Sequence, residues 1–128
     1  MIVSASHEHL EPILVIERAS FSQPWTESHF KSDLNNKISI NWVYQKDDYV
    51  VGYLFGWHVM DEYHLNNIAV ADSFRGLGIG IHLLKNMVIH LKETEVKSVF
   101  LEVSSGNLPA RKLYEKMGFV PQGERKDY

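Results

Sequence analysis

The chain has 128 residues, of which 45% are hydrophobic and 12% aromatic, so it can bury one core but has no room for two. Its charged fraction of 23% and formal net charge of -3 give no broad attraction to nucleic acid or to anionic membranes. The absence of cysteine excludes disulfides, a cysteine nucleophile and thiolate-bound zinc. No apolar run approaches the roughly 20 residues that span a bilayer, and no basic segment followed by an apolar stretch opens the chain. We expect a single cytoplasmic domain over residues 1–128.

The N-terminal segment predicts a short strand followed by a helix. Met1 to Ala5 is short and apolar, which is typical of a strand, and Ser6 offers an N-cap for the helix. The helix ends near Ser20 and is indicated by four residues that recur at helical spacing: Leu10, Ile13, Leu14 and Glu17.

A loop carrying Trp25 comes next, because Phe21 to Trp25 interrupts the helical periodicity. Pro24 disfavours helix at the residue before it. Thr26 can then cap a second helix that runs through Leu34. Two short helices therefore flank the loop.

The middle of the chain predicts three consecutive antiparallel strands. Ile38 to Gln45 and Tyr49 to Met60 are rich in β-branched and aromatic residues, and Lys46-Asp47-Asp48 between them favours a hairpin turn. A third extended run, Tyr63 to Val70, follows a turn at Asp61-Glu62. The three strands form a meander.

The last third predicts a helix, a strand, a second helix and a final strand. The first helix is indicated by apolar residues on one helical face: Leu83, Leu84, Met87, Val88 and Leu91. Val96 to Val103 is the next strand, Ala110 to Met117 the second helix ended by Gly118, and Phe119 begins the last strand. The order β-α-α-β-β-β-α-β-α-β predicts an α/β fold with a mixed central sheet and flanking helices, not a doubly wound one.

A glycine-rich loop from Arg75 to Gly80 lies between the third meander strand and the following helix. Backbone N–H groups at a helix N-terminus can converge on an anion, although glycines also serve tight turns and close packing. The loop lacks the Gly-Lys-Ser/Thr of nucleoside triphosphatases. Because its strand ends a meander and does not open a β-α-β unit, a dinucleotide-binding fold is disfavoured.

The pattern Arg75-x-x-Gly78-x-Gly80 resembles the coenzyme-binding signature of the GNAT acetyltransferase superfamily, and the order of elements agrees with that fold. The resemblance implies acetyl-CoA as cosubstrate. It also implies that the strand before the signature offers backbone groups to the pantetheine arm, namely Ile68, Ala69 and Val70. The signature loop would take the pyrophosphate, through Arg75, Gly76, Leu77, Gly78, Ile79 and Gly80.

Further segments are similar to bacterial ribosomal-protein alanine N-acetyltransferases, and the similarity covers nearly the whole chain. They are Gln23-Pro24-Trp25-Thr26, Asn67-Ile68-Ala69-Val70, Leu101-Glu102-Val103, Asn107 and Leu113-Tyr114-Glu115-Lys116-Met117-Gly118-Phe119. This resemblance implies that the acceptor is a protein N-terminus, such as an alanine or serine of a ribosomal protein.

The chain ends at Tyr128, before a further strand that this family has next to its acceptor groove. We therefore expect a GNAT domain that lacks the usual final strand and is truncated at its C-terminus. A shortened chain and a strand supplied by a partner both fit this ending, since exposed sheet edges invite pairing.

Glu102 and Tyr114 are the candidate catalytic residues. Glu102 lies near a strand end, where its carboxylate either removes a proton from the acceptor ammonium or is simply a solvated charge. Tyr114 shares a helical face with Ala110 and Met117, which makes it a candidate for the core. The resemblance implies in addition that its hydroxyl protonates the departing thiolate.

Three further residues have both a binding and a structural interpretation. Asn107 either caps the helix that begins near Leu108 or bonds the pantetheine arm, as the family suggests. Trp25 and Tyr128 are candidates for the acceptor groove, although such aromatic residues more often serve ordinary packing.

Seven histidines raise the question of a metal, in particular His7-x-His9 and the pair His58 and His64. Neither set has a third ligand at a recognisable spacing, so we expect no metal. Other functions compatible with the sequence are acetylation of a small amine, acyl-CoA binding without turnover, and a purely structural interaction domain.

Overall fold

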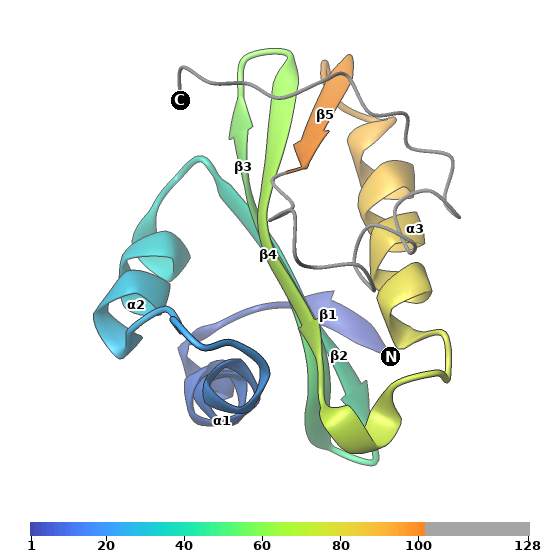
Figure 1. Cartoon of the computed structure of the whole chain (residues 1–128). Helices are drawn as coiled ribbons and strands as arrows, with labels where there is room; N and C mark the ends of the chain where they lie inside the picture. The colour runs from blue at the N-terminus through green and yellow to red at the C-terminus, as the bar shows by residue number, and fades with distance from the viewer. Residues whose placement is uncertain (102–128) are drawn as a thin grey trace.

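In the part of the chain that the structure describes, five strands form one mixed sheet, with α1 and α2 on one face and α3 on the other (Figure 1). The computed structural model describes residues 1–101. Their elements are β1 (Ile2–Ser4), the 3-10 turn η1 (His7–His9), α1 (Leu10–Ser20), α2 (Glu27–Asn35), β2 (Ser39–Lys46), β3 (Tyr49–Val59), β4 (Glu62–Val70), η2 (Asp72–Phe74), α3 (Ile79–Leu91) and β5 (Ser98–Leu101). This confirms the predicted order as far as β5. The helix expected from Ala110 and the strand expected from Phe119 lie outside the described residues.

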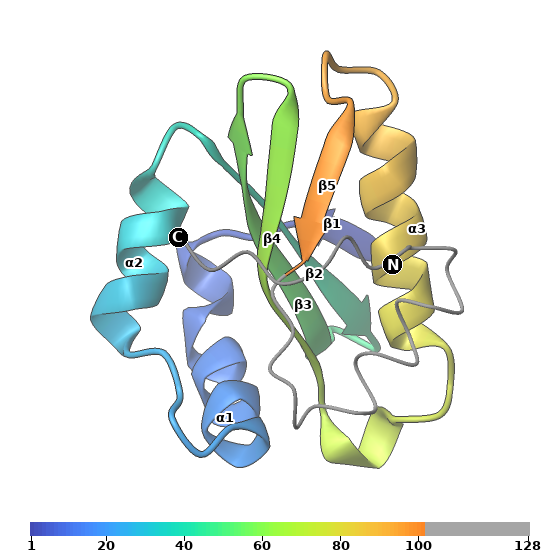
Figure 2. The ribbon, with the colours of Figure 1, turned by 45° about the horizontal axis from the view of Figure 1, so that its top comes forward.

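The strands are arranged in sequence order, β1-β2-β3-β4-β5. Every neighbouring pair is antiparallel except β4 and β5, which are parallel. The predicted mixed sheet is confirmed. Within residues 1–101, β5 pairs only with the first part of β4, from Glu62 to Leu65, and Figure 2 shows it lying beside that part.

The two hairpin turns were predicted with different success. Asp47 and Asp48 form the first turn with φ of 51° and 69°, a left-handed conformation that aspartate tolerates better than most residues. The second turn centres on Met60, with φ of 55°, and Asp61, so that Glu62 already pairs with Val59. The predicted Asp61-Glu62 turn is therefore one residue too late.

Strand β5 begins at Ser98, two residues after the predicted start at Val96. Val96 packs against the core cluster beside α3, so its apolar character reflects burial and not strand structure. Of the caps predicted for the first two helices, the one of α2 is confirmed: Thr26 Oγ1 accepts a hydrogen bond from His29 N (3.1 Å) at the start of α2. Ser6, however, is the N-cap of η1, and His9 is the N-cap of α1.

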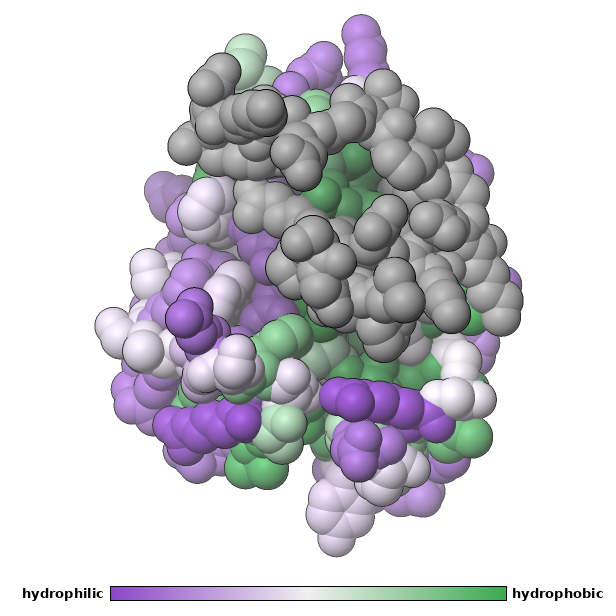
Figure 3. All heavy atoms as spheres, in the orientation of Figure 1, coloured by the Kyte–Doolittle hydropathy of each residue, from purple (hydrophilic) through white to green (hydrophobic). Residues whose placement is uncertain are grey.

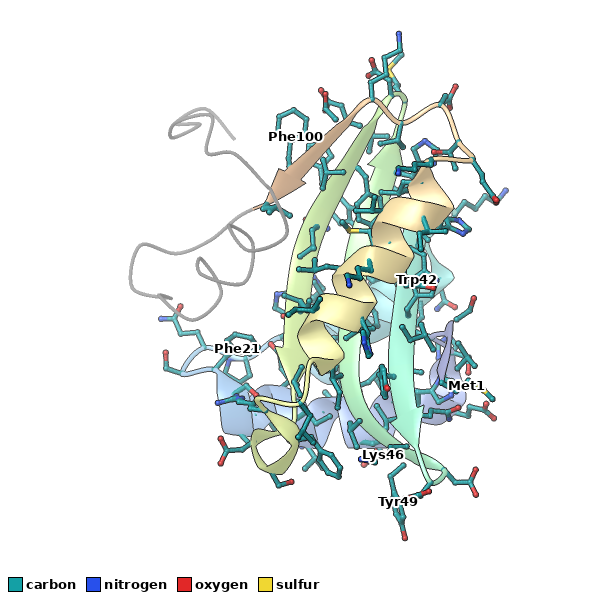
Figure 4. The ribbon with its side chains drawn as sticks, turned by 90° about the vertical axis from the view of Figure 1, so that its right-hand side faces the viewer. Met1, Phe21, Trp42, Lys46, Tyr49 and Phe100 are labelled. Carbon is teal, nitrogen blue, oxygen red and sulfur yellow. The ribbon has the colours of Figure 1, made fainter. Side chains whose placement is uncertain are left out.

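Two apolar clusters bury the two faces of the sheet. The cluster on the α3 face includes Trp42, Leu54, Leu65, Leu83, Leu84 and Met87, and Figure 4 looks onto α3 with Trp42 of β2 beside it. The cluster on the α1 and α2 face includes Ile13, Leu14, Phe30, Tyr53 and Phe55. Among the helices of residues 1–101, none combines the length and apolar character that a bilayer span requires.

A β-bulge at Asn66 changes which face of the sheet the residues of β4 occupy. The pairing with β3 shifts between Phe55 and Gly56, which are opposite Asn67 and Leu65. Before the bulge, Leu65 belongs to the cluster on the α3 face. After it, Ala69 belongs to the opposite cluster, and by strand alternation Asn67 faces α1 as well.

Candidate active site

The second half of β4 presents peptide groups on its outer edge. Ala71 N–H donates to Val51 O (2.8 Å), which makes these two residues a hydrogen-bonded antiparallel pair. Alternation along the strand then turns the peptide groups of Ala69 toward β3. It turns those of Ile68 and Val70 away from β3, toward the side of β5.

This outer edge has no strand partner beyond Leu65 within the part of the chain that the structure describes. Unpaired N–H and C=O groups on a strand edge can bond to an extended amide-containing ligand as another strand would. The Val70 carbonyl already accepts a hydrogen bond from Arg75 Nε (3.2 Å). The N–H groups of Ile68 and Val70 therefore face outward, as their predicted binding to a pantetheine arm requires.

The glycine loop is built around two left-handed residues, Gly76 with φ of 82° and Gly78 with φ of 83°. A Cβ atom at either position would meet nothing within 4 Å, so these residues are required by backbone conformation and not by lack of space. Gly78 is the N-cap of α3, and the first helical bond runs from His82 N to Gly78 O (3.0 Å). The N–H groups of Ile79, Gly80 and Ile81 thus precede the first helical bond and can face an anion.

Arg75 joins the end of β4 to the loop and to α1. Besides Val70 O, its guanidinium bonds Asp72 Oδ1 (3.2 Å) and Ser20 Oγ (3.4 Å). Its side chain is half-exposed, so it can also reach a bound phosphate. The structure therefore brings together the residues predicted for the coenzyme from Ile68 to Val70 and from Arg75 to Gly80, while Asn107, also predicted for it, lies outside the described residues.

The surface around this loop is mixed in polarity. In Figure 3, hydrophilic residues (purple) and hydrophobic ones (green) alternate along the lower edge of the molecule, where Figure 1 places the connection from β4 to α3. Leu77 is 59% exposed there. A ligand with charged phosphates and an apolar arm suits such a surface.

Trp25 lies on the opposite face of the sheet, over the middle of β3. Its ring stacks on His29 with centroids 3.8 Å apart and meets Phe55 edge-on at 6.3 Å. The packing interpretation of Trp25 therefore holds, and a role in an acceptor groove remains compatible with it. Its backbone N–H donates to Glu17 Oε2 (2.8 Å).

Glu17 is a buried carboxyl group. The sequence predicted its position on a helix face but no role for it. Only 1% of it is exposed, and it accepts hydrogen bonds from Tyr53 Oη (2.5 Å) and Asn67 Nδ2 (2.7 Å) besides that from Trp25. Burial, together with the hydrogen bond to Glu17 and its charge, raises the pKa of Tyr53 well above its ordinary value. The available signal was a glutamate in phase with Ile13 and Leu14 on an apolar helix face.

Four predicted site residues lie outside the described residues: Glu102, Asn107, Tyr114 and Tyr128. Leu101, the last described residue, pairs with Leu65 at the end of β5. The catalytic and binding roles of Glu102, Asn107, Tyr114 and Tyr128 remain predictions.

The histidines considered as metal ligands have other partners. His58 Nε2 bonds Met60 O (2.9 Å), and His64 Nε2 lies 2.9 Å from Glu62 Oε1. Within residues 1–101 there is no group of three or more histidine, aspartate or glutamate side chains that could hold a metal ion.

Comparison with known proteins identifies the family. Residues 10–119 match the acetyltransferase (GNAT) family. The chain belongs to the GNAT acetyltransferase family. GNAT acetyltransferases use acetyl-CoA as cosubstrate, so the chain is an acetyl-CoA-dependent N-acetyltransferase, as the resemblance of the signature implied.

Individual relatives agree with this assignment. The chain is 37% identical over 122 residues to a protein of Bacillus subtilis (strain 168), covering 94% of this chain and 81% of that protein. It is 33% identical over 118 residues to the ribosomal protein bS18-alanine N-acetyltransferase of Haemophilus influenzae, covering 92% and 80% of the two chains. The crystal structure of the ribosomal-protein-S18-alanine N-acetyltransferase from Escherichia coli superposes with a TM-score of 0.90 at 29% identity, covering 100% of this chain and 82% of that one. The expected GNAT fold is confirmed.

Proposed function

We propose that this GNAT enzyme transfers the acetyl group of acetyl-CoA to the N-terminal α-amino group of a ribosomal protein. The observation that carries the proposal is the convergence of two features: the outer edge of β4, which has no strand partner beyond Leu65 within residues 1–101, and the glycine loop at the start of α3. The acceptor is taken from the relatives, whose names specify the alanine of ribosomal protein bS18.

The proposed reaction is direct transfer within a ternary complex. The N–H groups of Ile68 and Val70 and the N-terminus of α3 hold the coenzyme and place the thioester carbonyl beside β4. A backbone N–H of this strand stabilises the oxyanion as the amine nitrogen attacks the carbonyl carbon. The C–N bond forms and the C–S bond breaks. Glu102 takes the proton from the amine, and Tyr114 gives a proton to the sulfur.

Mass spectrometry of a defined peptide library incubated with acetyl-CoA tests the acceptor. Peptides that begin with alanine or serine are expected to gain one acetyl group at the N-terminus, and polyamines or aminoglycosides in the same mixture are expected to react far more slowly. Preference for a small amine would identify a small-molecule acetyltransferase. Binding of acetyl-CoA without any product would identify a binding module.

Glu102→Gln tests the proposed base. A positioned base contributes roughly 10²- to 10⁴-fold, so kcat/KM for the peptide should fall by that order, and its remaining dependence on pH should follow the titration of the peptide's own α-amino group. Glu93→Gln, an exposed glutamate after α3, is the matched control and should act as wild type. Peptide acetylation by Glu102→Gln at the wild-type rate across pH would remove the assignment.

A further inference from the structure

The carboxyl group of Glu17 joins three separate elements in the interior of the α1 face. It lies on α1 and receives hydrogen bonds from β3 through Tyr53 Oη, from β4 through Asn67 Nδ2 and from the α1–α2 loop through Trp25 N. Both of its oxygens act as acceptors, the pattern of an ionised carboxylate. None of the ion pairs within residues 1–101 involves it.

The division of the three bonds between the two oxygens is uneven. Oε1 accepts from both strands, at 2.5 Å from Tyr53 and 2.7 Å from Asn67. Oε2 accepts from the loop alone, at 2.8 Å from Trp25 N. One oxygen is thus committed to the sheet and the other to the loop.

The bond from Trp25 N–H to Glu17 Oε2 ties the backbone of the loop to α1. Within the described residues, Trp25 N–H is the only backbone group of residues 22–25 that makes a hydrogen bond. Buried carboxylates are rarely the most stable solution for a core, because removing the charge from water is costly. What Glu17 provides is a fixed position of the loop relative to the sheet.

The position that is fixed lies beside the proposed reaction centre. Asn67 directly follows the bulge and precedes Ile68, and Trp25 packs its ring on Phe55, the residue paired with Asn67. The loop therefore adjoins the segment of β4 whose outer edge would hold the coenzyme. An acceptor that enters along the loop would reach this segment from the side opposite α3.

We propose that Glu17 is a positioning residue for the acceptor, holding the Trp25 loop against β4 so that the incoming amine is aligned with the thioester. It acts through Trp25 and Asn67 and does not take part in proton transfer. This inference rests on the proposed function, since it concerns the acceptor side of the same site.

Glu17→Gln is the test, because its amide matches the glutamate in shape. Its oxygen can replace Oε1, which keeps both strand bonds, and its NH₂ group then faces the N–H of Trp25, where two donors cannot bond. The loop is released while the sheet keeps its ties. We expect KM for an alanine-initiated peptide to rise about tenfold and KM for acetyl-CoA to stay within about twofold.

Tyr53→Phe is the matched control. It removes one of the two strand bonds and leaves Oε2 and Trp25 untouched, so it should lower stability without raising KM for the peptide. Glu17→Asp keeps the carboxylate but shortens its reach, and its KM for the peptide should lie between those of wild type and Glu17→Gln. If Glu17→Gln does not fold, Glu17→Asp provides the test in its place.

Amide hydrogen exchange at Trp25, followed by NMR, gives a readout that needs no turnover. Exchange should be fast in Glu17→Gln and slow in wild type and Tyr53→Phe. Equal exchange at Trp25 in all three proteins would overturn the positioning role. Fast exchange in Glu17→Gln with an unchanged KM for the peptide would overturn it as well. A wild-type enzyme that acetylates no peptide would instead overturn the proposed function.

Discussion

Among residues 1–101, two carboxyl groups are buried on the α1 and α2 face, and their surroundings differ. Glu17 has three hydrogen-bond donors around its two oxygens. Asp33 of α2 is only 3% exposed, and its Oδ2 has no hydrogen-bond partner among residues 1–101. The first group organises its neighbours, whereas the second is expected to reduce stability when ionised.

Replacement of Asp33 by asparagine is expected to stabilise the protein at neutral pH. Burial raises the pKa of Asp33 above its usual value, while the positive charge of His29 and the indole N–H of Trp57 act against this rise. A folded-state pKa above the unfolded one means that the native protein holds its proton longer. The stability of the wild type therefore falls as pH rises from the unfolded pKa through the folded one.

Urea unfolding of wild type and Asp33→Asn between pH 3.5 and about 7 measures this difference. The advantage of Asp33→Asn should be smallest at the acidic end and grow as pH rises through that window. Asp61→Asn, at an exposed position, controls for the loss of one charge. An Asp33→Asn protein that is less stable than wild type at pH 7 would show that the ionised carboxylate is favoured by its surroundings.

The glycine loop and α3 form the element on which, in the proposed function, coenzyme binding depends. Gly78→Ala is expected to lower the free energy of unfolding by about 1–2 kcal/mol, because alanine resists the φ of 83° at this position. Gly78→Asn should lose less, since asparagine tolerates this conformation and a Cβ has space there. Calorimetric titration should show weaker binding of acetyl-CoA to Gly78→Ala.

The pair of variants separates two reasons for glycine at this position. If Gly78→Asn keeps both stability and affinity, the loop needs only the backbone conformation. If it keeps stability and loses affinity, the bound coenzyme itself needs the space of the missing side chain. Wild-type stability and affinity in Gly78→Ala would contradict the role given to the left-handed turn.

The order of the helices and strands could be predicted because it depends on local preferences of the residues. Aspartates at 47 and 48 favour a left-handed turn, and the turn formed where it was predicted. Methionine carries no such preference, so the turn at Met60 was placed one residue late. Val96 is apolar because it packs against the core cluster and not because it lies in a strand, so the predicted start of β5 was too early.

The part of the candidate site that is formed by backbone groups could be predicted from the sequence. The part formed by side chains from distant segments could be predicted less well. The loop from Arg75 to Gly80 has its own glycine pattern. The bulge at Asn66 has none, because alternation alone does not reveal an extra residue. Glu17 meets Asn67 across 50 positions of sequence, a contact that depends on that bulge and on the packing of α1 against the sheet.

At the scale of the whole molecule, the proposed function places the coenzyme and the acceptor on different sides of the sheet. The α3 face and the outer edge of β4 carry the groups predicted for the coenzyme, and the α1 face carries the Trp25 loop held by Glu17. Strand β4 contributes to both faces of the sheet, since alternate residues belong to the cluster on the α3 face and to the cluster on the α1 and α2 face. The two substrates would therefore meet at one strand from opposite faces.

This arrangement predicts how amide signals respond when acetyl-CoA is titrated into the ¹⁵N-labelled protein. The amide protons of Ile68 and Val70 should shift downfield, because they face away from β3 and would bond the pantetheine arm. The amide of Ala69 faces β3 and should move least of the three. Inorganic pyrophosphate, which has no such arm, should shift the amides of residues 76–81 and leave Ile68 and Val70 unchanged. If the three β4 amides responded alike, or if pyrophosphate moved them as acetyl-CoA does, the arm could not lie along this edge, and the separation of coenzyme and acceptor by β4 would fail.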